Sequence, residues 1–255
     1  MTEILHRTLP YHPMTPRPLP GIEPLAPEDW LRFDEGFAPQ MQERTRLLRD
    51  HADAVLAMAP EAEPAAQELL DHVLAARYGA GRQVQRITRP DGIEVALNRA
   101  APMETLGHIA QQDFCILEKP EGSTEHILTA AVLCFPASWT LSEKVMKPLL
   151  AIHAPVQDYD SGIARRVQRL FDGVQAGRPL WRFNALWYAD PSLHQPRLEQ
   201  DPRPTSTPET RAYLRSELQS IYRLPQTRAV VFSIHTQVLA RADVLSQWGD
   251  EKTPQ

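Results

Sequence analysis

The chain has little glycine and cysteine and no excess of basic residues, and each shortage argues against a class of protein. It contains 11 glycines against 24 prolines in 255 residues, which predicts stiff extended connections with few tight glycine turns. Its two cysteines, Cys115 and Cys134, lie in apolar segments without CxxC spacing, so we expect reduced core thiols of a cytoplasmic protein. A net charge of -5 argues against a nucleic-acid partner.

Membrane spans and the common catalytic motifs are also missing from the sequence. No apolar run reaches the length of a membrane span, and the first residues lack the apolar core of a signal peptide. The chain has no HExxH motif, no P-loop, no G-x-S-x-G elbow and no full G-x-G-x-x-G. Gly79 and Gly81 form only a fragment of the last motif, and no strand precedes them, so a dinucleotide loop is not predicted.

Proline density and polarity divide the chain into three parts. Residues 1–27 carry seven prolines and predict an extended arm on the surface, residues 28–240 a single domain, and residues 241–255 a polar tail that frays. A helix start is expected at Pro27, and the spacing of apolar residues favours helices over Gln40–Met58, Pro64–Tyr78, Ser161–Val174 and Pro208–Tyr222.

Runs of apolar and β-branched residues predict the strands. They lie at Ile93–Leu97, Phe114–Leu117, His126–Phe135, Trp181–Tyr188 and Ala229–Leu239. The second and third runs flank a turn at Pro120–Ser123 and predict a hairpin, while residues 189–208 are expected to form a long loop. The fold class is therefore α+β, an antiparallel or mixed sheet with helices packed on one face.

Two histidines are candidate metal ligands. His153 precedes Pro155, and because proline restricts the backbone before it, we expect the chain there to be extended and stiff. A neutral imidazole held in this way suits a transition metal, although a buried histidine bonded to the backbone fits the same pattern. His235 lies inside an apolar strand, where a satisfied core histidine is the alternative to a ligand.

Pairs of polar residues form the other candidates. Arg182 and Asn184 share one strand face, as a salt bridge and a turn contact or as two donors aimed into a pocket. Glu217 and Gln219 lie in the predicted helix 208–222, where a solvated face is the plain alternative to a chemical role. Asp113 and Lys119 are weaker candidates of the same kind.

Taken together, several stretches resemble the α-subunit family of haem-dependent oxidative N-demethylases. They follow the family's order over roughly residues 20 to 240 and are specific in combination. The main pieces are Pro27–Leu31, Gln112–Leu117, Cys134–Trp139, Ile152–Val156, Arg182–Asn184, Leu214–Ser220 and Val231–Thr236.

This resemblance implies a PAS-like antiparallel sheet whose helices enclose haem b. The implied reaction is oxidative N-demethylation of a small secondary amine, dimethylamine-like, which consumes O2 and releases formaldehyde. Electrons would come from a separate flavin and iron–sulfur reductase or a ferredoxin-type donor, since the chain has no cysteine cluster for such a centre. The implied iron ligand is His153, with His235 as second choice.

The resemblance also implies roles for four polar residues. Arg182 would hold a haem propionate, and Glu217 would pair with the amine or supply protons. Asn184 and Gln219 would hydrogen-bond a ligand on the iron. The sequence departs from the family at Leu218 and Ala185, where the family carries arginine and tryptophan. The alternatives are a non-catalytic haem-binding PAS-like sensor or carrier, and an interaction protein without haem.

Overall fold

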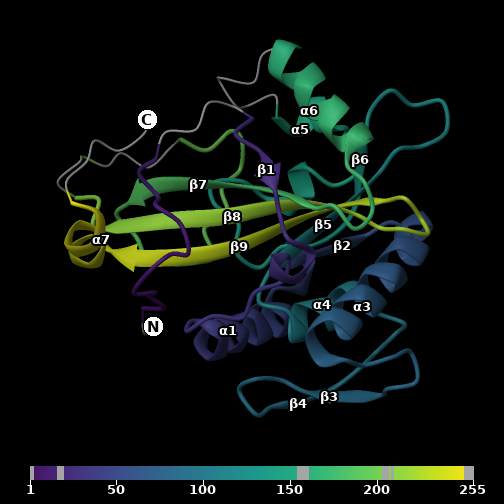
Figure 1. The fold of residues 1–255 in the computed structure, drawn as a ribbon, viewed down its shortest axis with the longest axis horizontal. Helices are drawn as coiled ribbons and strands as arrows, with labels where there is room; N and C mark the ends of the chain where they lie inside the picture. The colour runs from purple at the N-terminus through teal and green to yellow at the C-terminus, as the bar shows by residue number, and fades with distance from the viewer. Residues whose placement is uncertain (1–2, 16–19, 154–160, 203–206, 208–209, 250–255) are drawn as a thin grey trace.

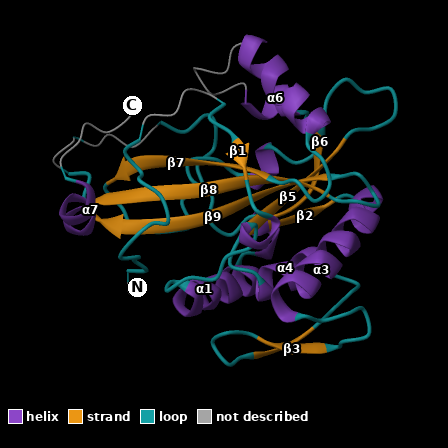
Figure 2. Ribbon diagram, viewed as in Figure 1, coloured by secondary structure: helices purple, strands orange, loops and turns teal. Residues whose placement is uncertain are grey.

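A seven-stranded antiparallel sheet forms the centre of the protein, with helices on both of its faces (Figures 1 and 2). The structure is a computed structural model that describes residues 3–15, 20–153, 161–202, 207 and 210–249. The strand order is β1-β7-β8-β9-β5-β6-β2. The strands are β1 (Glu23–Pro24), β2 (Leu56–Met58), β5 (Asp113–Glu118), β6 (Ile127–Val132), β7 (Leu180–Tyr188), β8 (Tyr213–Arg223) and β9 (Val230–Ala240). The predicted α+β class and antiparallel pairing are confirmed.

Seven α-helices lie in the described part of the chain. They are α1 (Phe37–Asp50), α2 (Ala52–Val55), α3 (Glu63–Tyr78), α4 (Pro102–Ile109), α5 (Leu149–His153), α6 (Ser161–Gly173) and α7 (Arg241–Trp248). Short 3-10 turns lie at η1 (Pro27–Asp29), η2 (Pro60–Ala62) and η3 (Leu141–Glu143), and β3 (Arg86–Thr88) pairs with β4 (Glu94–Ala96) in a separate hairpin. None of the helices within these ranges is long and apolar enough to cross a membrane.

The two faces of the sheet are covered by different helices. Helices α1, α3 and α4 cover one face, here called the α3 face, and α5 and α6 cover the other, called the α6 face (Figure 1). Strand β5 shows the cause, since Phe114 and Ile116 pack towards α3 while Cys115 and Leu117 pack towards α6. The expectation of helices on one face only is therefore wrong, because both sides of the central strands are apolar.

Several predicted elements are confirmed, with recognisable start and stop residues. Helix α3 has Pro64 in its first turn and ends at Gly79, whose φ of 58° and N–H bond to the Leu74 carbonyl make a left-handed cap. Helix α6 turns Phe171 and its partly buried neighbour Leu170 towards the sheet. Strands β5 and β6 pair as the expected hairpin.

Other predictions are corrected by the structure. The segment expected to be a helix over Pro208–Tyr222 is strand β8 from Tyr213 onwards, and Pro208 lies outside the described residues. The single helix predicted over Gln40–Met58 is divided in the structure into helices α1 and α2, and its last three residues form strand β2. The polar tail begins with helix α7, whose Val244 is buried against β8 and β9 residues. The N-terminal arm is also not purely superficial, because His6 is 1% exposed.

Candidate functional site

Residues singled out from the sequence meet on the α6 face of β7 and β8. Asn184 pairs with Glu217 and Arg182 with Gln219, and residues directly opposite in an antiparallel pair point to the same side. The Asn184 Nδ2 donates to Glu217 Oε2 over 3.3 Å, and the Gln219 Nε2 donates to the same oxygen over 3.2 Å. Glu217, Asn184, Gln219 and Arg215 are called the Glu217 cluster below.

Arg215 is part of this cluster, and sequence reasoning gave it no role. Its Nε lies 3.4 Å from Glu217 Oε1, while its Nη1 and Nη2 donate to the carbonyls of Leu193 and Phe135 over 2.9 and 2.7 Å. These carbonyls fix a buried guanidinium beside the carboxylate. The signal that could have found Arg215 is its spacing of two from Glu217, which places both on one face of a strand.

Two buried polar atoms beside the cluster have no hydrogen-bond partner among the described residues. They are Arg182 Nε and Thr236 Oγ1, and Thr236 lies opposite Glu217 on β9. Burial lowers the pKa of Arg182 from its ordinary value, and the nearby Glu217 carboxylate partly opposes that effect. Buried polar groups are normally paired, so these two atoms are exceptions to the usual pairing beside the cluster.

His153 lies on the same side of the sheet as the Glu217 cluster. It is the last residue of α5, so the expectation of an extended backbone is wrong at this position, while Pro155 lies outside the described residues. The His153 Nδ1 donates to the Leu149 carbonyl over 2.8 Å, which places the lone pair of the neutral ring on Nε2. Burial lowers the pKa of His153, with the Leu149 bond opposing it, and so favours the neutral, metal-binding form.

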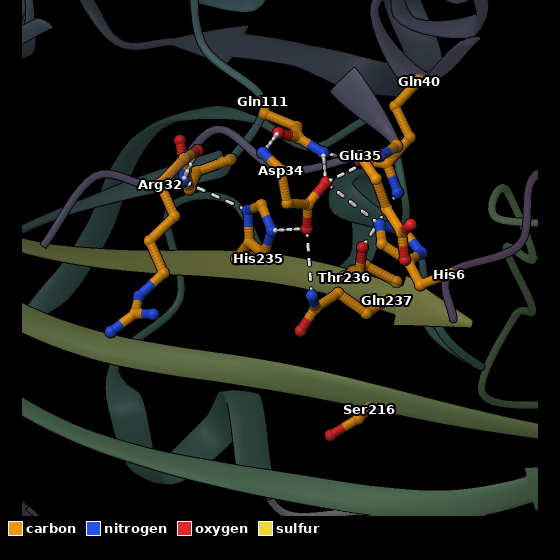
Figure 3. Close-up of polar contacts among 12 residues, drawn as sticks. His6, Arg32, Asp34, Glu35, Gln40, Gln111, Ser216, His235, Thr236 and Gln237 are labelled. Carbon is orange, nitrogen blue, oxygen red and sulfur yellow. Dashed lines mark hydrogen bonds and ion pairs between the residues drawn. The ribbon is translucent and has the colours of Figure 1, made fainter. Parts of the chain in front are cut away.

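His235 occupies the opposite face. It pairs with Leu218 across β8 and β9, and both of its ring nitrogens have partners. Its Nε2 lies 2.7 Å from Asp34 Oδ2 (Figure 3). Its Nδ1 lies 3.1 Å from Gln112 Nε2. We therefore keep His153 alone as the proposed ligand.

Asp34 is the centre of a polar network on the α3 face (Figure 3). Burial opposes its charge, but hydrogen bonds from His235 and His6 outweigh burial and hold its pKa far below the ordinary value of 3.8. The network ties the N-terminal arm and the η1–α1 connection to β9, which is a structural role. The donors to Asp34 are His6 Nε2 (3.1 Å), Gly36 N (2.9 Å), Gln111 Nε2 (2.7 Å), His235 Nε2 (2.7 Å) and Gln237 Nε2 (2.9 Å).

The remaining sequence candidates, Asp113 and Lys119, have partners away from the cluster. Asp113 is buried and accepts from Arg44 Nη1 over 2.5 Å, while the Lys119 ammonium lies 2.8 Å from Asp172. Both cysteines are free and buried, as expected, and burial raises the pKa of each thiol to about 12.

A comparison with known protein families identifies the class of protein to which this chain belongs. Within the described ranges, no group of at least three His, Cys, Asp or Glu side chains is arranged to hold a metal ion, but a haem iron needs only one or two side-chain ligands. Residues 21–250 match a family model described as haem-dependent oxidative N-demethylase, alpha subunit-like. The match covers most of the sequence, and the chain belongs to the haem-dependent oxidative N-demethylase alpha-subunit-like family.

Proposed function

We propose that this chain is the haem-binding oxygenase component of an oxidative N-demethylase and acts on a small secondary amine such as dimethylamine. The observation that carries the proposal is the Glu217 cluster, in which a carboxylate that is 9% exposed lies beside two amides and a guanidinium. Membership of the family supports haem as the cofactor. Arg215 is one cationic partner of this carboxylate at Oε1, whereas the two amides at Oε2 are neutral donors. A secondary amine is a cation at neutral pH and would be a second cationic partner on the Oε2 side.

We place the haem on the α6 face, and the types of side chain found there support this proposal. His153 contributes an imidazole whose pKa is lowered by burial, Arg182 contributes a buried guanidinium nitrogen with no hydrogen-bond partner among the described residues, and Ile152, Leu170 and Phe232 contribute apolar side chains on that side. We assign the iron to His153 and a propionate to Arg182, within a PAS-like fold that binds haem b. The haem supplies the oxygen and one-electron chemistry when bound, with electrons from a separate flavin and iron–sulfur component.

The Glu217 cluster binds and orients the amine. The Glu217 carboxylate pairs with the ammonium of the substrate, while Asn184 and Gln219 hold its Oε2 and Arg215 lies beside its Oε1. Glu217 then accepts the ammonium proton, which leaves the amine nitrogen neutral. The N-methyl carbon would leave as formaldehyde and the remaining amine as methylamine, while O2, two protons and two electrons from the separate donor would be consumed and water formed.

An absorbance spectrum of the purified protein tests the haem assignment. The chain is expressed with added iron, and we expect the purified protein to show a Soret band. The variant His153→Ala should lose this band. The control variant His51→Ala, at an exposed position, should keep it. An unchanged band in His153→Ala contradicts the ligand assignment. Protein without any band supports an interaction protein in place of an oxygenase.

Formaldehyde release from dimethylamine tests the reaction itself. With a reductase or chemical reductant, Glu217→Gln should keep the Soret band and lose at least ten-fold in kcat/KM, because the ammonium loses its anionic partner. The matched control is Glu121→Gln, an exposed glutamate in the β5–β6 turn. A haem-loaded protein that releases no formaldehyde supports the sensor or carrier.

A further inference from the structure

Two buried basic side chains hold the segment Leu193–Glu199 at its two ends. At the first end, Arg215 Nη1 donates to the Leu193 carbonyl over 2.9 Å. At the other end, the Lys144 Nζ donates to Glu199 Oε1. Arg215 belongs to the Glu217 cluster, so this segment begins at the site proposed for the amine and ends at Lys144.

Lys144 also holds the last turn of helix α5. Its Nζ donates to the Ile152 carbonyl over 2.8 Å, one residue before His153. Carbonyls in the last turn of a helix have no partner inside the helix, and a basic side chain is one of the groups that bond them. A single ammonium group therefore joins the end of α5 to Glu199.

The backbone around Lys144 is fixed by further contacts. The Lys144 N–H donates to the Leu141 carbonyl over 2.9 Å and closes the turn η3. The adjacent Glu143 accepts the Glu199 N–H, over 3.2 Å at Oε1 and 3.1 Å at Oε2. The end of the segment is thus tied to η3 twice, once through the Lys144 ammonium and once through the Glu143 carboxylate.

The His153 imidazole depends on the position of this short helix. Its Nδ1 is bonded to the Leu149 carbonyl within α5, so the ring moves with the helix. Helix α5 has five residues, which are too few for a stable helix without tertiary contacts. The contact of Lys144 with the Ile152 carbonyl supplies one such contact next to the ring.

We propose that Lys144 is a positioning residue for His153. It holds the His153 end of α5 to the segment Leu193–Glu199, and Arg215 holds the other end of that segment beside Glu217. Lys144 thereby sets where the imidazole lies relative to the Glu217 cluster. This role rests on the proposed function, because the position of His153 matters for the reaction when His153 binds the haem iron.

Amide hydrogen exchange on the haem-free chain tests the contact with α5. The Ile152 N–H donates to the Pro148 carbonyl over 3.0 Å, so its exchange measures the opening of this helix. Lys144→Met should speed that exchange roughly ten-fold or more, because the Ile152 carbonyl loses a charged donor. The amides of β8 should change by less than about two-fold. An unchanged rate at Ile152, or an equal rise in β8, overturns the proposal.

A second variant tests the segment without removing the buried lysine. Glu199→Gln alters a side chain that is 39% exposed, so the fold should be retained, and exchange at Ile152 should rise roughly three-fold or more. The matched control is Lys147→Met, which removes a neighbouring cation at a partly exposed position of the same loop. Its exchange should equal that of the parent. An unchanged rate at Ile152 in Glu199→Gln would show that the segment does not hold α5 and would overturn the proposal.

Transfer of haem to excess apomyoglobin tests the consequence for His153. The loaded Lys144→Met variant should lose haem roughly ten-fold faster than the parent, because groups that orient a metal ligand commonly change metal affinity by that factor. Its Soret maximum should also shift, while Lys147→Met should match the parent in both measurements. Equal rates of haem loss in parent and Lys144→Met overturn the positioning role. A parent without a Soret band contradicts the proposed function instead, and exchange at Ile152 still decides whether Lys144 holds α5.

Discussion

Leu218 and His235 lie directly opposite each other on β8 and β9, and both point to the α3 face. Leu218 and Ala185 are the two positions where the resemblance leads us to expect arginine and tryptophan, and Ala185 pairs with Ser216 on the same face. Glu217 points to the other side of the sheet. The side chains at positions 185 and 218 therefore lie on the α3 face and contribute nothing to the Glu217 cluster on the other side.

Truncating Leu218 should affect stability and not substrate binding. Leu218 is 3% exposed, so Leu218→Ala should cost about 2–5 kcal/mol of unfolding free energy through lost burial and a residual cavity. Urea unfolding measures this cost, and the KM for dimethylamine should stay within about two-fold of the parent value. Leu186→Ala is the control, because Leu186 is 47% exposed and should cost less than about 0.5 kcal/mol. A large change in KM would show that position 218 reaches the amine.

Arg44 and Asp113 form a buried ion pair that should dominate the stability of the α4–β5 region. Arg44 is 0% exposed, its Nε donates to the Gly107 carbonyl over 3.2 Å, and Asp113 also accepts the N–H groups of Cys134 and Phe135 over 2.8 Å each. Arg44→Met leaves the Asp113 carboxylate buried without its cation, which should cost about 3–5 kcal/mol.

The control for Arg44 is Arg46→Met on the outer side of the same helix. Arg46 pairs with Glu43 three residues earlier and is 36% exposed on its side chain, so its removal should cost at most about 0.5 kcal/mol. Chemical unfolding of both variants gives the comparison. Equal midpoints for the two variants would contradict a structural role for the Arg44–Asp113 pair.

Strands β5, β6, β7 and β9 and helices α3 and α6 follow from the sequence, whereas β8 does not. Leu214, Leu218 and Ile221 recur at spacings of four and three, which is the helical pattern, and the segment is rich in good helix formers. The alternation typical of a strand is hidden because polar residues such as Arg215 and Ser220 are buried as deeply as the apolar ones.

This misassignment also explains why the site could not be assembled from the sequence. In a helix, residues two apart point in different directions, so Glu217 and Gln219 would be separated. In a strand, the same spacing places them side by side, and the pairing with β7 adds Asn184 and Arg182. The sequence therefore identified these candidate residues, but not that they share one face of the sheet. That arrangement depends on strand β8, which the helix propensity of its residues did not predict. Asp34 and its partners gave no signal, because they are more than 200 positions apart in the case of His235.

Acid should destabilise the fold through His126. Burial lowers its pKa from the ordinary 6.5, with Asp172 and a Gln168 hydrogen bond opposing, so the folded state holds fewer protons than the unfolded chain. Stability is then complete above about pH 6.5 and is lost as pH falls from there through the lowered pKa. Thermal unfolding at pH 5 and 7.5 should differ less in His126→Gln than in the parent. The exposed His51→Gln should keep the parent's pH dependence, and an identical slope in His126→Gln would contradict the assignment.

Asp34→Asn should loosen the N-terminal arm from the sheet. The carboxylate accepts hydrogen bonds from His6 and His235, and its loss should cost about 2–4 kcal/mol, because these donors then face a neutral amide. The pKa of Asp34 lies below its ordinary 3.8, so its contribution is present above that pH and is lost only in stronger acid. The variant should therefore show a flatter loss of stability below about pH 4.

Amide hydrogen exchange measures how firmly the N-terminal arm is held to the sheet. The His6 N–H donates to the Val238 carbonyl over 2.7 Å, and its protection should fall in Asp34→Asn while that of the β5–β6 hairpin stays unchanged. Asp29→Asn is the matched control, since Asp29 is exposed and only approaches Arg32 to 3.6 Å. If His6 kept its protection in Asp34→Asn, the bridge to Leu239 and the buried Leu9 would have to hold the arm without the carboxylate.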